Sequence, residues 1–274
     1  MTRFDRRALL ATGGSAALLA ATGVALDAAP RRGGHLRIAV PRNYDSLGPV
    51  ALTAVFETLT ELTPEGVLRG RLATNWRGSM DGLEWDLNIR PGVEFHNGEP
   101  LGAADVAESL HAAPIGRPDF CNIEVIDPLR IRLHLAESDP HLPIRLAQSD
   151  YVIRPKGDKG SGLIGSGLYA VRHVVPGGGM TAVRVAKHYF TELAGWVDRV
   201  DVVAMSDPHV RAGALRQELV EAAVFFDVKE AGLVIDKRRY AQAGGPALVV
   251  NERVGCPIPT VGLDVRIAER YWLV

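Results

Sequence analysis

Residues 81–100 read DGLEWDLNIRPGVEFHNGEP, and the first half of this stretch alternates between apolar and polar side chains. The alternating apolar residues are Leu83, Trp85, Leu87 and Ile89. Successive side chains of a β-strand point to opposite faces, so this pattern predicts a strand with one buried face. The Pro91-Gly92 pair that follows is typical of a tight turn and predicts where the strand ends.

The segments on either side of this strand predict a mixture of strands and helices. We expect strands at residues 36–40, 123–126, 129–135, 151–154, 168–174, 181–185, 223–226 and 247–250, and helices at residues 53–62, 101–110 and 208–219. Antiparallel hairpins mixed with helices favour an α/β protein of the mixed α+β kind, rather than a series of repeating βαβ units.

The composition is that of an ordinary globular protein. The chain has 274 residues, of which 47% are hydrophobic and 23% charged, and its formal net charge is -1. This length accommodates one large domain or two smaller ones, each with its own core. A charge close to zero provides no electrostatic basis for binding nucleic acid or an anionic membrane, so we expect neither partner.

The first thirty residues differ from the rest of the chain. Arg3, Arg6 and Arg7 precede an apolar run rich in Ala, Leu and Gly that extends over residues 8–26. A basic start followed by a short apolar stretch is the layout of an export signal, and the paired arginines resemble the twin-arginine (Tat) motif. We therefore expect residues 1–29 to be a Tat-like signal peptide and the mature protein to be periplasmic. An uncleaved membrane anchor is the alternative, because the run is close to the minimum length of a membrane span.

The sequence contains no motif that identifies a catalytic or metal site. Its eight histidines are scattered, and neither an H-E-x-x-H motif nor a G-x-S-x-G elbow is present. Cys121 and Cys256 lie far apart without a C-x-x-C spacing. The sequence therefore allows either a single disulfide between them or two free, buried thiols. We therefore expect no enzyme, no metal site and no cofactor.

Residues 160–165, GSGLIG, match the G-x-G-x-x-G pattern of dinucleotide-binding sites. Such a site needs a helix after the glycines, so that the helix N-terminus faces the pyrophosphate. Here residues 166–174 predict a strand instead, and no acidic residue stands about twenty positions further on. A surface turn therefore explains these glycines better than a cofactor site does.

Several blocks of the chain resemble, in order, the bacterial extracellular solute-binding proteins of family 5, which capture peptides or nickel for ABC importers. The most specific block comprises residues 72–76 (LATNW), 81–100 and 104–110 (ADVAESL). Residues 33–38 (GGHLRI) and 56–59 (FETL) resemble the first strand of the family and the helix after it. Weaker blocks are residues 165–169 (GSGLY), 214–223 (ALRQELVEAA) and 264–271 (DVRIAERY).

The resemblance implies the fold of a type II periplasmic binding protein, in which two lobes close on a ligand. On this basis residues 30–58 and 163–250 would form a discontinuous first lobe, residues 59–162 an inserted subdomain, and residues 251–274 the start of a second lobe. Members of the family are longer, so the resemblance also implies that the chain is truncated before most of the second lobe.

The resemblance further implies the periplasmic substrate-binding component of an ABC importer. Its ligand would be a short peptide or another small solute, and its partners the permease in the inner membrane and a second chain that supplies the missing lobe. The candidate ligand-binding residues are Asn43, Tyr44 and Asp45, in the loop after the first strand, although a solvated loop is an equal alternative. The alternative function is that of a one-lobed exported interaction protein, or a degenerate remnant, that no longer traps a ligand.

Overall fold

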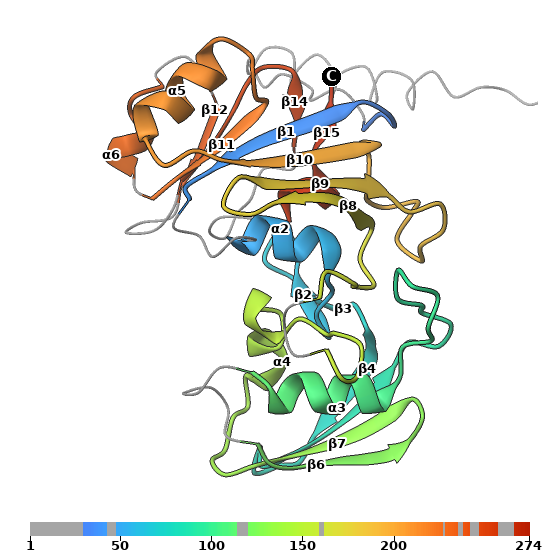
Figure 1. Cartoon of the computed structure of the whole chain (residues 1–274). Helices are drawn as coiled ribbons and strands as arrows, with labels where there is room; N and C mark the ends of the chain where they lie inside the picture. Colours follow the sequence, from blue (N-terminus) through green and yellow to red (C-terminus); the bar gives the residue numbers. More distant parts are fainter. Residues whose placement is uncertain are drawn as a thin grey trace, which may run out of the picture.

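The computed structural model describes residues 30–42, 48–113, 120–158, 162–226, 228–234, 238–241, 247–256 and 266–274. Two β-sheets form the opposite ends of the molecule (Figure 1). The larger sheet contains the first strand together with strands from the C-terminal half of the chain, and the smaller sheet comes from the segment between them.

The larger sheet has seven strands in the order β12-β13-β11-β1-β10-β9-β8. Its strands are β1 (His35–Val40), β8 (Tyr169–Val175), β9 (Gly179–Arg184), β10 (Arg199–Ala204), β11 (Ala222–Phe225), β12 (Arg238–Ala241) and β13 (Ala247–Val250). β1 pairs in parallel with β10 on one side and with β11 on the other, while the outer pairs are antiparallel. Segments far apart in the sequence therefore meet at the centre of this sheet.

Helices cover both faces of the larger sheet. The helices are α2 (Gly48–Val55) and α7 (Ile267–Arg270) on one face, and α5 (Pro208–Arg216) and α6 (Val228–Ala231) on the other. Leu36 and Ile38 of β1 lie in the core that contains α2, which we call the first core, whereas Ala39 lies in the core that contains α5. The alternation of apolar side chains along β1 is thus the reason that helices can pack on both faces.

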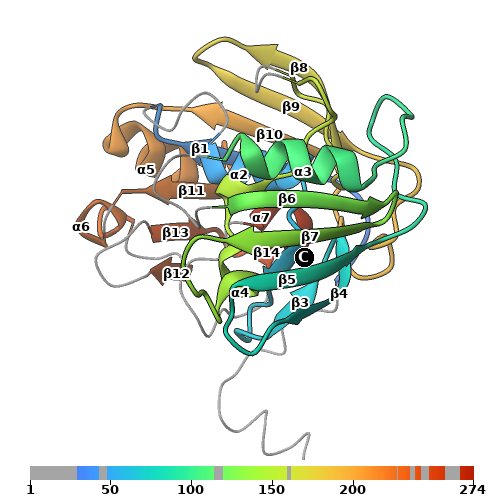
Figure 2. The same ribbon diagram turned by 90° about the horizontal axis from the view of Figure 1, so that it is seen from below.

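The smaller sheet is antiparallel, with the strand order β4-β5-β7-β6 (Figure 2). Its elements are β4 (Ala73–Gly78), β5 (Glu84–Ile89), β6 (Phe120–Asp127), β7 (Arg130–Leu135) and the covering helix α3 (Ala103–His111). The alternation expected for β5 is confirmed, because Trp85, Leu87 and Ile89 are buried and form a second core with Val106 and Leu110 of α3.

Short elements lie between and beside the two sheets. They are the hairpin of β2 (Thr60–Leu62) and β3 (Leu68–Gly70), α4 (Leu142–Arg145), the 3-10 helix η1 (Ser149–Tyr151), and the pair of β14 (Val254–Gly255) and β15 (Trp272–Leu273). Within the described ranges, no helix is long and apolar enough to cross a membrane.

Capping side chains account for the start of two helices that were expected from the sequence. At α5, the Asp207 carboxylate accepts a hydrogen bond from the backbone N–H of His209 at 2.8 Å, and Pro208 occupies the first turn. At α3, the Asp105 carboxylate accepts a hydrogen bond from the backbone N–H of Gly102 at 2.8 Å. Both helices lie where the sequence predicts them.

Two expectations about local structure are wrong, and several observed strands, among them β4 and β10, were not expected. Residues 53–62 do not form one helix, because α2 ends at Val55 and Thr60–Leu62 form β2. Residues 151–154 form the end of η1 and an isolated bridge at Ile153 instead of a strand. β10 is missing from the expected strands, although Val200 and Val202 alternate with more exposed neighbours. For residues 53–62 and 151–154, pairing with distant residues, rather than local propensity, decides the conformation.

The two cysteines do not form the disulfide that the sequence left open. Cys121 is exposed on β6, whereas Cys256 is buried in the first core, and neither forms a disulfide.

The expected division into a first lobe, an inserted subdomain and the start of a second lobe stays a prediction. The described part of residues 251–274 packs against the larger sheet, because Ile267, Ala268 and Tyr271 lie in the first core with β1 and α2. Residues on both sides of position 251 therefore share one core in this structure.

Candidate functional site

The carboxyl ends of the parallel strands β10, β1 and β11 lie at one edge of the larger sheet. The chain leaves β1 for α2 on one face and leaves β10 for α5 on the other face. Ligands of open α/β sheets bind in the crevice outside the carboxyl ends of the strands, at the point where the connections diverge. This edge is therefore the candidate ligand site of the larger sheet.

A small cavity occupies this edge. Its volume is about 30 Å³, and its lining includes Arg42, the first residues of α2, and Gly177 and Gly179 of the β8–β9 hairpin. Gly179 permits the close approach of the hairpin, because a Cβ at this position would lie 1.9 Å from the Val202 carbonyl oxygen. A cavity of this size holds on the order of one or two water molecules, so it can receive only the end of a ligand group.

The predicted ligand-binding residues Asn43, Tyr44 and Asp45 lie outside the described residues. Their described neighbours in the sequence, Arg42 and Gly48, both line the small cavity. The assignment of the three loop residues to ligand binding stays a prediction.

A larger cleft lies beside α2, between α3 and residues 149–158. Its volume of about 350 Å³ is in the range of small-molecule sites. Leu52 and Val152 contribute apolar walls. The charged residues of this cleft are Glu108, Asp150, Arg154 and Asp158.

The charge in this larger cleft is predominantly negative, because three carboxylates line it with one guanidinium group. Arg154 is held by Asp158, with 3.3 Å between Nη1 and Oδ2, and by the ring of Phe56, whose centroid lies 4.1 Å from Cζ. Ser109 Oγ accepts a hydrogen bond from the backbone N–H of Arg154 at 2.9 Å, which ties α3 to the opposite wall. The cleft is therefore held in shape by its own contacts and suits a cationic group such as an amine.

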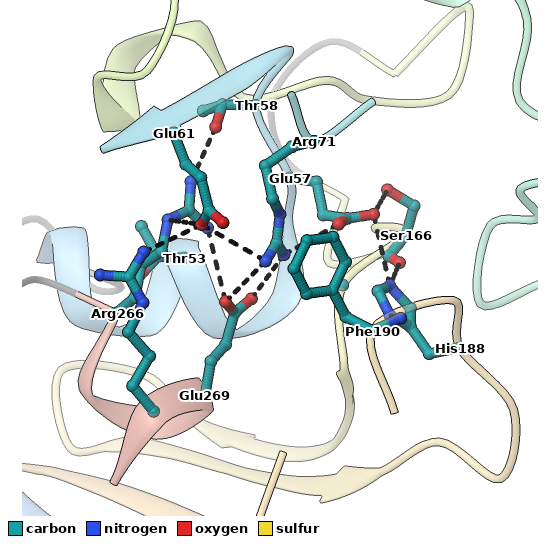
Figure 3. Close-up of polar contacts among 12 residues, drawn as sticks. Thr53, Glu57, Thr58, Glu61, Arg71, Ser166, His188, Phe190, Arg266 and Glu269 are labelled. Carbon is teal, nitrogen blue, oxygen red and sulfur yellow. Dashed lines mark hydrogen bonds and ion pairs between the residues drawn. The ribbon is translucent and has the colours of Figure 1, made fainter. Parts of the chain in front are cut away.

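A buried cluster of ion pairs joins α7 to the β2–β3 hairpin and the segments on either side of it (Figure 3). Arg71, at its centre, is 1% exposed and lies 2.8 Å from a carboxylate oxygen of Glu57 and 3.5 Å from one of Glu61. Its guanidinium group also forms two hydrogen bonds with the Glu269 carboxylate, at 2.9 and 3.1 Å. The ring of Phe190 covers this group, 4.4 Å from Cζ. The cluster therefore connects the segment after α2, the segment after β3 and helix α7.

One carboxylate of the cluster, Glu61, is shared by four arginines. Its Oε2 lies 2.9 Å from Arg270 Nη2, 3.3 Å from Arg266 Nε and 3.5 Å from Arg71 Nη1, and Arg69 donates to its other oxygen. A single carboxylate has few acceptor positions for so many donors, so Glu61 cannot satisfy every donor of the four arginines.

The opposite side of the cluster contains a serine, a histidine and a carboxylate, but not in a catalytic arrangement. Ser166 Oγ donates to Glu57 Oε2 at 3.0 Å, and Tyr189 donates to the other oxygen of Glu57. His188 Nε2 lies 3.4 Å from Glu57 Oε2 and 3.0 Å from the backbone carbonyl of Ser166. Nucleophilic catalysis requires the serine hydroxyl to contact the base. Here the hydroxyl contacts the carboxylate, so these residues stabilise Glu57 instead.

The arginines keep the buried carboxylates ionised. Burial alone would raise the pKa of Glu57, but Arg71 and His188 outweigh burial and lower this pKa to about 2. Burial likewise opposes ionisation of Glu61, and Arg71, Arg266 and Arg270 lower its pKa to about 2. For Arg71, burial lowers the pKa, yet Glu269 and Glu57 raise it well above its ordinary value. These groups are therefore charged at neutral pH.

The last glycine of the G-x-G-x-x-G match, Gly165, has a packing role, because a Cβ there would lie 2.0 Å from the Val55 carbonyl oxygen. Gly167, just after the match, packs in the same way, because a Cβ there would lie 2.7 Å from the Ala54 carbonyl oxygen. The chain continues from Gly167 into β8, as the sequence predicts, and not into a helix. These glycines allow the chain to pass close to the end of α2. In the described parts of the chain, no group of three or more His, Cys, Asp or Glu side chains could hold a metal ion.

Sequence reasoning missed the buried cluster. The only local signal of the cluster is a spacing of four residues between like charges. It separates Glu57 from Glu61 and Arg266 from Arg270. Glu57 and Glu61 lie beyond the end of α2, so helical spacing does not explain their shared partners. Arg71 and Glu269 are separated by 198 residues, and only the tertiary fold brings them together.

Comparisons with known proteins agree with this architecture. A model of the family described as bacterial extracellular solute-binding proteins, family 5 (middle part), matches residues 67–250. The transcriptional regulator SgrR of Escherichia coli is 32% identical over 126 residues, which cover 43% of this chain and 22% of the regulator.

Solved structures share the fold. The periplasmic binding protein AgaA of A. tumefaciens, in complex with agropinic acid, has a TM-score of 0.63 and 24% identity, covering 73% of this chain and 45% of that chain. DppA of Helicobacter pylori with a bound peptide has a TM-score of 0.63 and 20% identity, covering 74% of this chain and 49% of that chain. A nickel ABC transporter protein of Bacillus halodurans has a TM-score of 0.64 and 22% identity, covering 76% of this chain and 47% of that chain. The match thus spans less than half the length of these solved relatives.

Proposed function

Because the chain belongs to the bacterial extracellular solute-binding proteins of family 5, we propose that it acts as the substrate-binding component of an ABC importer. The observation that carries this proposal is the family match, which extends from the β2–β3 hairpin to the end of β13. The ligand in this proposal is a short peptide or a similar small solute. The partners are the permease in the inner membrane and a second chain that covers the clefts.

The chemistry of the cleft beside α2 supports a ligand with a positively charged end. Glu108, Asp150 and Asp158 outnumber Arg154 in a cleft of about 350 Å³, and a protonated amine is the peptide group that such a cleft attracts. A site usually buries about 70–90% of its ligand. Tight capture therefore requires a further surface opposite this cleft, which is the role that we assign to the second chain.

Export by the Tat pathway is part of the same proposal. The family consists of extracellular binding proteins. The paired Arg6 and Arg7, followed by an apolar run, support a twin-arginine signal and hence a periplasmic location.

Titration calorimetry on the purified protein tests the proposal. Tri-alanine should bind with saturable heat, and N-acetylated tri-alanine should bind about tenfold more weakly, because it lacks the charged amine. Glu108→Gln should weaken tri-alanine binding by about the same factor. Glu137→Gln, which changes an exposed glutamate outside the cleft, is the matched control and should have no effect.

Equal binding of the two peptides, or an unaffected Glu108→Gln variant, would show that the amine is not recognised here. The loop assignment is tested in the same assay by Tyr44→Ala and Asp45→Asn, which should each reduce the affinity. Nickel–histidine is the second ligand to titrate, and the absence of heat with both ligands would contradict the proposal of solute capture.

A one-lobed interaction protein is the second candidate function. The observation that favours it is the small size of the cavity at the sheet edge, about 30 Å³. If no peptide, amino acid or metal complex raises the melting temperature, while a partner protein binds the purified chain, this second candidate replaces the first.

A further inference from the structure

A third cleft lies on the far side of the buried ion-pair cluster from Ser166 and His188. It has a volume of about 320 Å³ and opens between the β2–β3 hairpin, the segment before β10 and the C-terminal strand β15. It shares no lining residue with the two clefts beside α2. Whatever it binds would therefore be a ligand additional to the one proposed above.

The inner wall of this third cleft is rich in arginine side chains. Arg69 and Arg270 line it, and both use Glu61 as their nearest carboxylate, which they share with Arg71 and Arg266. Glu269 also lines the cleft, but Arg71 already occupies both of its oxygens. The remaining carboxylate, Glu65, is exposed at the rim. Three arginines thus line the cleft with two carboxylates, and the buried Glu61 behind this wall pairs with Arg69 and Arg270.

Arg69 has donors available for a ligand. Its Nε–H donates to Glu61, and its Nη groups have no protein acceptor among the residues that the structure describes. The side chain is 41% exposed, and its guanidinium carbon lies 5.1 Å from the centroid of the Phe190 ring. Contact with Glu61 on one edge and Phe190 on one face holds the group in place while its outer edge stays open. A fixed guanidinium edge of this kind matches a carboxylate, which can accept two parallel hydrogen bonds.

The other walls of the cleft are aromatic and apolar. They include Trp196, Trp272, Pro30, Pro64 and Leu193. Trp272 is 7% exposed and Leu193 is 65% exposed, so one wall is fixed in the core while the other is open to solvent. The ring of Trp196 is oriented by Arg32, whose Cζ lies 5.3 Å from its centroid. Flat aromatic groups pack well against such surfaces.

We propose that this third cleft binds a small aromatic carboxylate. The carboxylate pairs with the outer edge of Arg69, and the ring packs against Trp196. This site is separate from the clefts beside α2, so it does not depend on the solute that they hold.

Titration of the purified protein with naphthoate tests this proposal, with the uncharged naphthamide as a matched ligand. Binding is followed by calorimetry and by the indole N–H resonance of Trp196, which is assigned with Trp196→Phe. Naphthoate should bind at least about tenfold more tightly than naphthamide, because only the carboxylate can pair with Arg69.

Arg69→Gln should weaken naphthoate binding about tenfold and leave naphthamide binding unchanged. This variant should still fold, because Glu61 keeps three other arginine partners. Arg77→Gln, at an exposed position of the neighbouring strand β4, is the control and should bind like the unmodified protein.

Two results would overturn the proposal. One is equal affinity for naphthoate and naphthamide, and the other is an Arg69→Gln variant that folds and binds naphthoate normally. A failure of naphthoate to bind at millimolar concentration has the same consequence. None of these results bears on the binding of peptides, because Arg69 does not line the clefts beside α2.

Discussion

At the scale of single residues, the buried cluster contains three charged side chains in the interior of the protein, those of Glu57, Glu61 and Arg71. Each is at most 1% exposed. Burying an ion costs several kcal/mol, and a partner in good geometry recovers most of this cost. Removing one partner leaves an uncompensated charge and costs about 3–5 kcal/mol. The cluster therefore adds little net stability, but it penalises any arrangement in which α7 does not meet β2 and β3.

Stability at acid pH should depend on Glu57. Its pKa is lowered from 4.5 to about 2, so its contribution is complete above pH 4.5 and is lost as the pH falls from 4.5 toward 2. Urea unfolding at pH 7, 5, 4 and 3 should give a free energy of unfolding that decreases below pH 5. In Glu57→Gln, the free energy should be lower by about 3 kcal/mol at pH 7, and its decrease toward pH 3 should be smaller.

The control for this measurement is Glu137→Gln, because Glu137 is exposed. Its profile should follow that of the unmodified protein. If Glu57→Gln gave a profile parallel to that of the unmodified protein, the acid sensitivity would come from other carboxylates.

At the scale of elements, the end of α2 packs closely against the turn after β5 and the start of β8. Gly167 donates its backbone N–H to the Val55 carbonyl oxygen at 2.9 Å, and His96 donates its backbone N–H to the Gly165 carbonyl oxygen at 2.8 Å. These bonds join α2, the turn after β5 and the start of β8. The absence of a side chain at both glycines makes this approach possible.

Gly165→Ala and Gly213→Ala should change stability in opposite directions. A Cβ on Gly165 would lie 2.0 Å from the Val55 carbonyl oxygen, so the backbone must shift and the free energy of unfolding should fall by about 1–3 kcal/mol. Gly213 lies within α5 with no atom near the new Cβ, so alanine should raise the free energy by up to about 1 kcal/mol. Urea unfolding measures both values. If Gly165→Ala left the free energy of unfolding unchanged, the packing between residue 165 and the Val55 carbonyl group would be loose.

Local patterns predicted the elements whose burial alternates regularly and failed where distant pairing decides. β5 follows its alternation, and α3 and α5 begin at residues that can cap a helix. Residues 53–62 have helical spacing of apolar side chains, yet the chain extends after Val55. There Leu59 O accepts the backbone N–H of Arg71 at 3.0 Å, which is a bond to the segment between β3 and β4. Local spacing carries no information about that partner.

At the scale of the whole molecule, the C-terminal segment completes the core of the larger sheet. Tyr271 is fully buried with Ile267 and Ala268, against α2 and the strands around β1. The same segment supplies Glu269 and Arg270 to the buried cluster. Residues 266–274 thus contribute to both the apolar core and the charged joint between the two sheets.

Tyr271→Ala should destabilise the protein strongly. Removal of a fully buried aromatic side chain leaves a cavity and should lower the free energy of unfolding by about 3–5 kcal/mol. Val274→Ala, at a position that is 55% exposed, should change it by less than about 0.5 kcal/mol. Thermal and urea unfolding report both changes. A small effect of Tyr271→Ala would mean that the C-terminal segment does not pack on the first core in solution.

The sequence by itself determined the mixed α/β class, the strand within residues 81–89, the family resemblance and the strand, rather than a helix, that follows Gly165. Those features depend on side-chain periodicity and on ordered local motifs, which are readable along the chain. Only the tertiary structure decided which residues share the ion-pair cluster, where the three clefts lie and how the C-terminal segment packs. Arg71 meets Glu269 across 198 residues. The physical reason is that burial and electrostatic pairing depend on distance in space, which spacing along the chain does not specify.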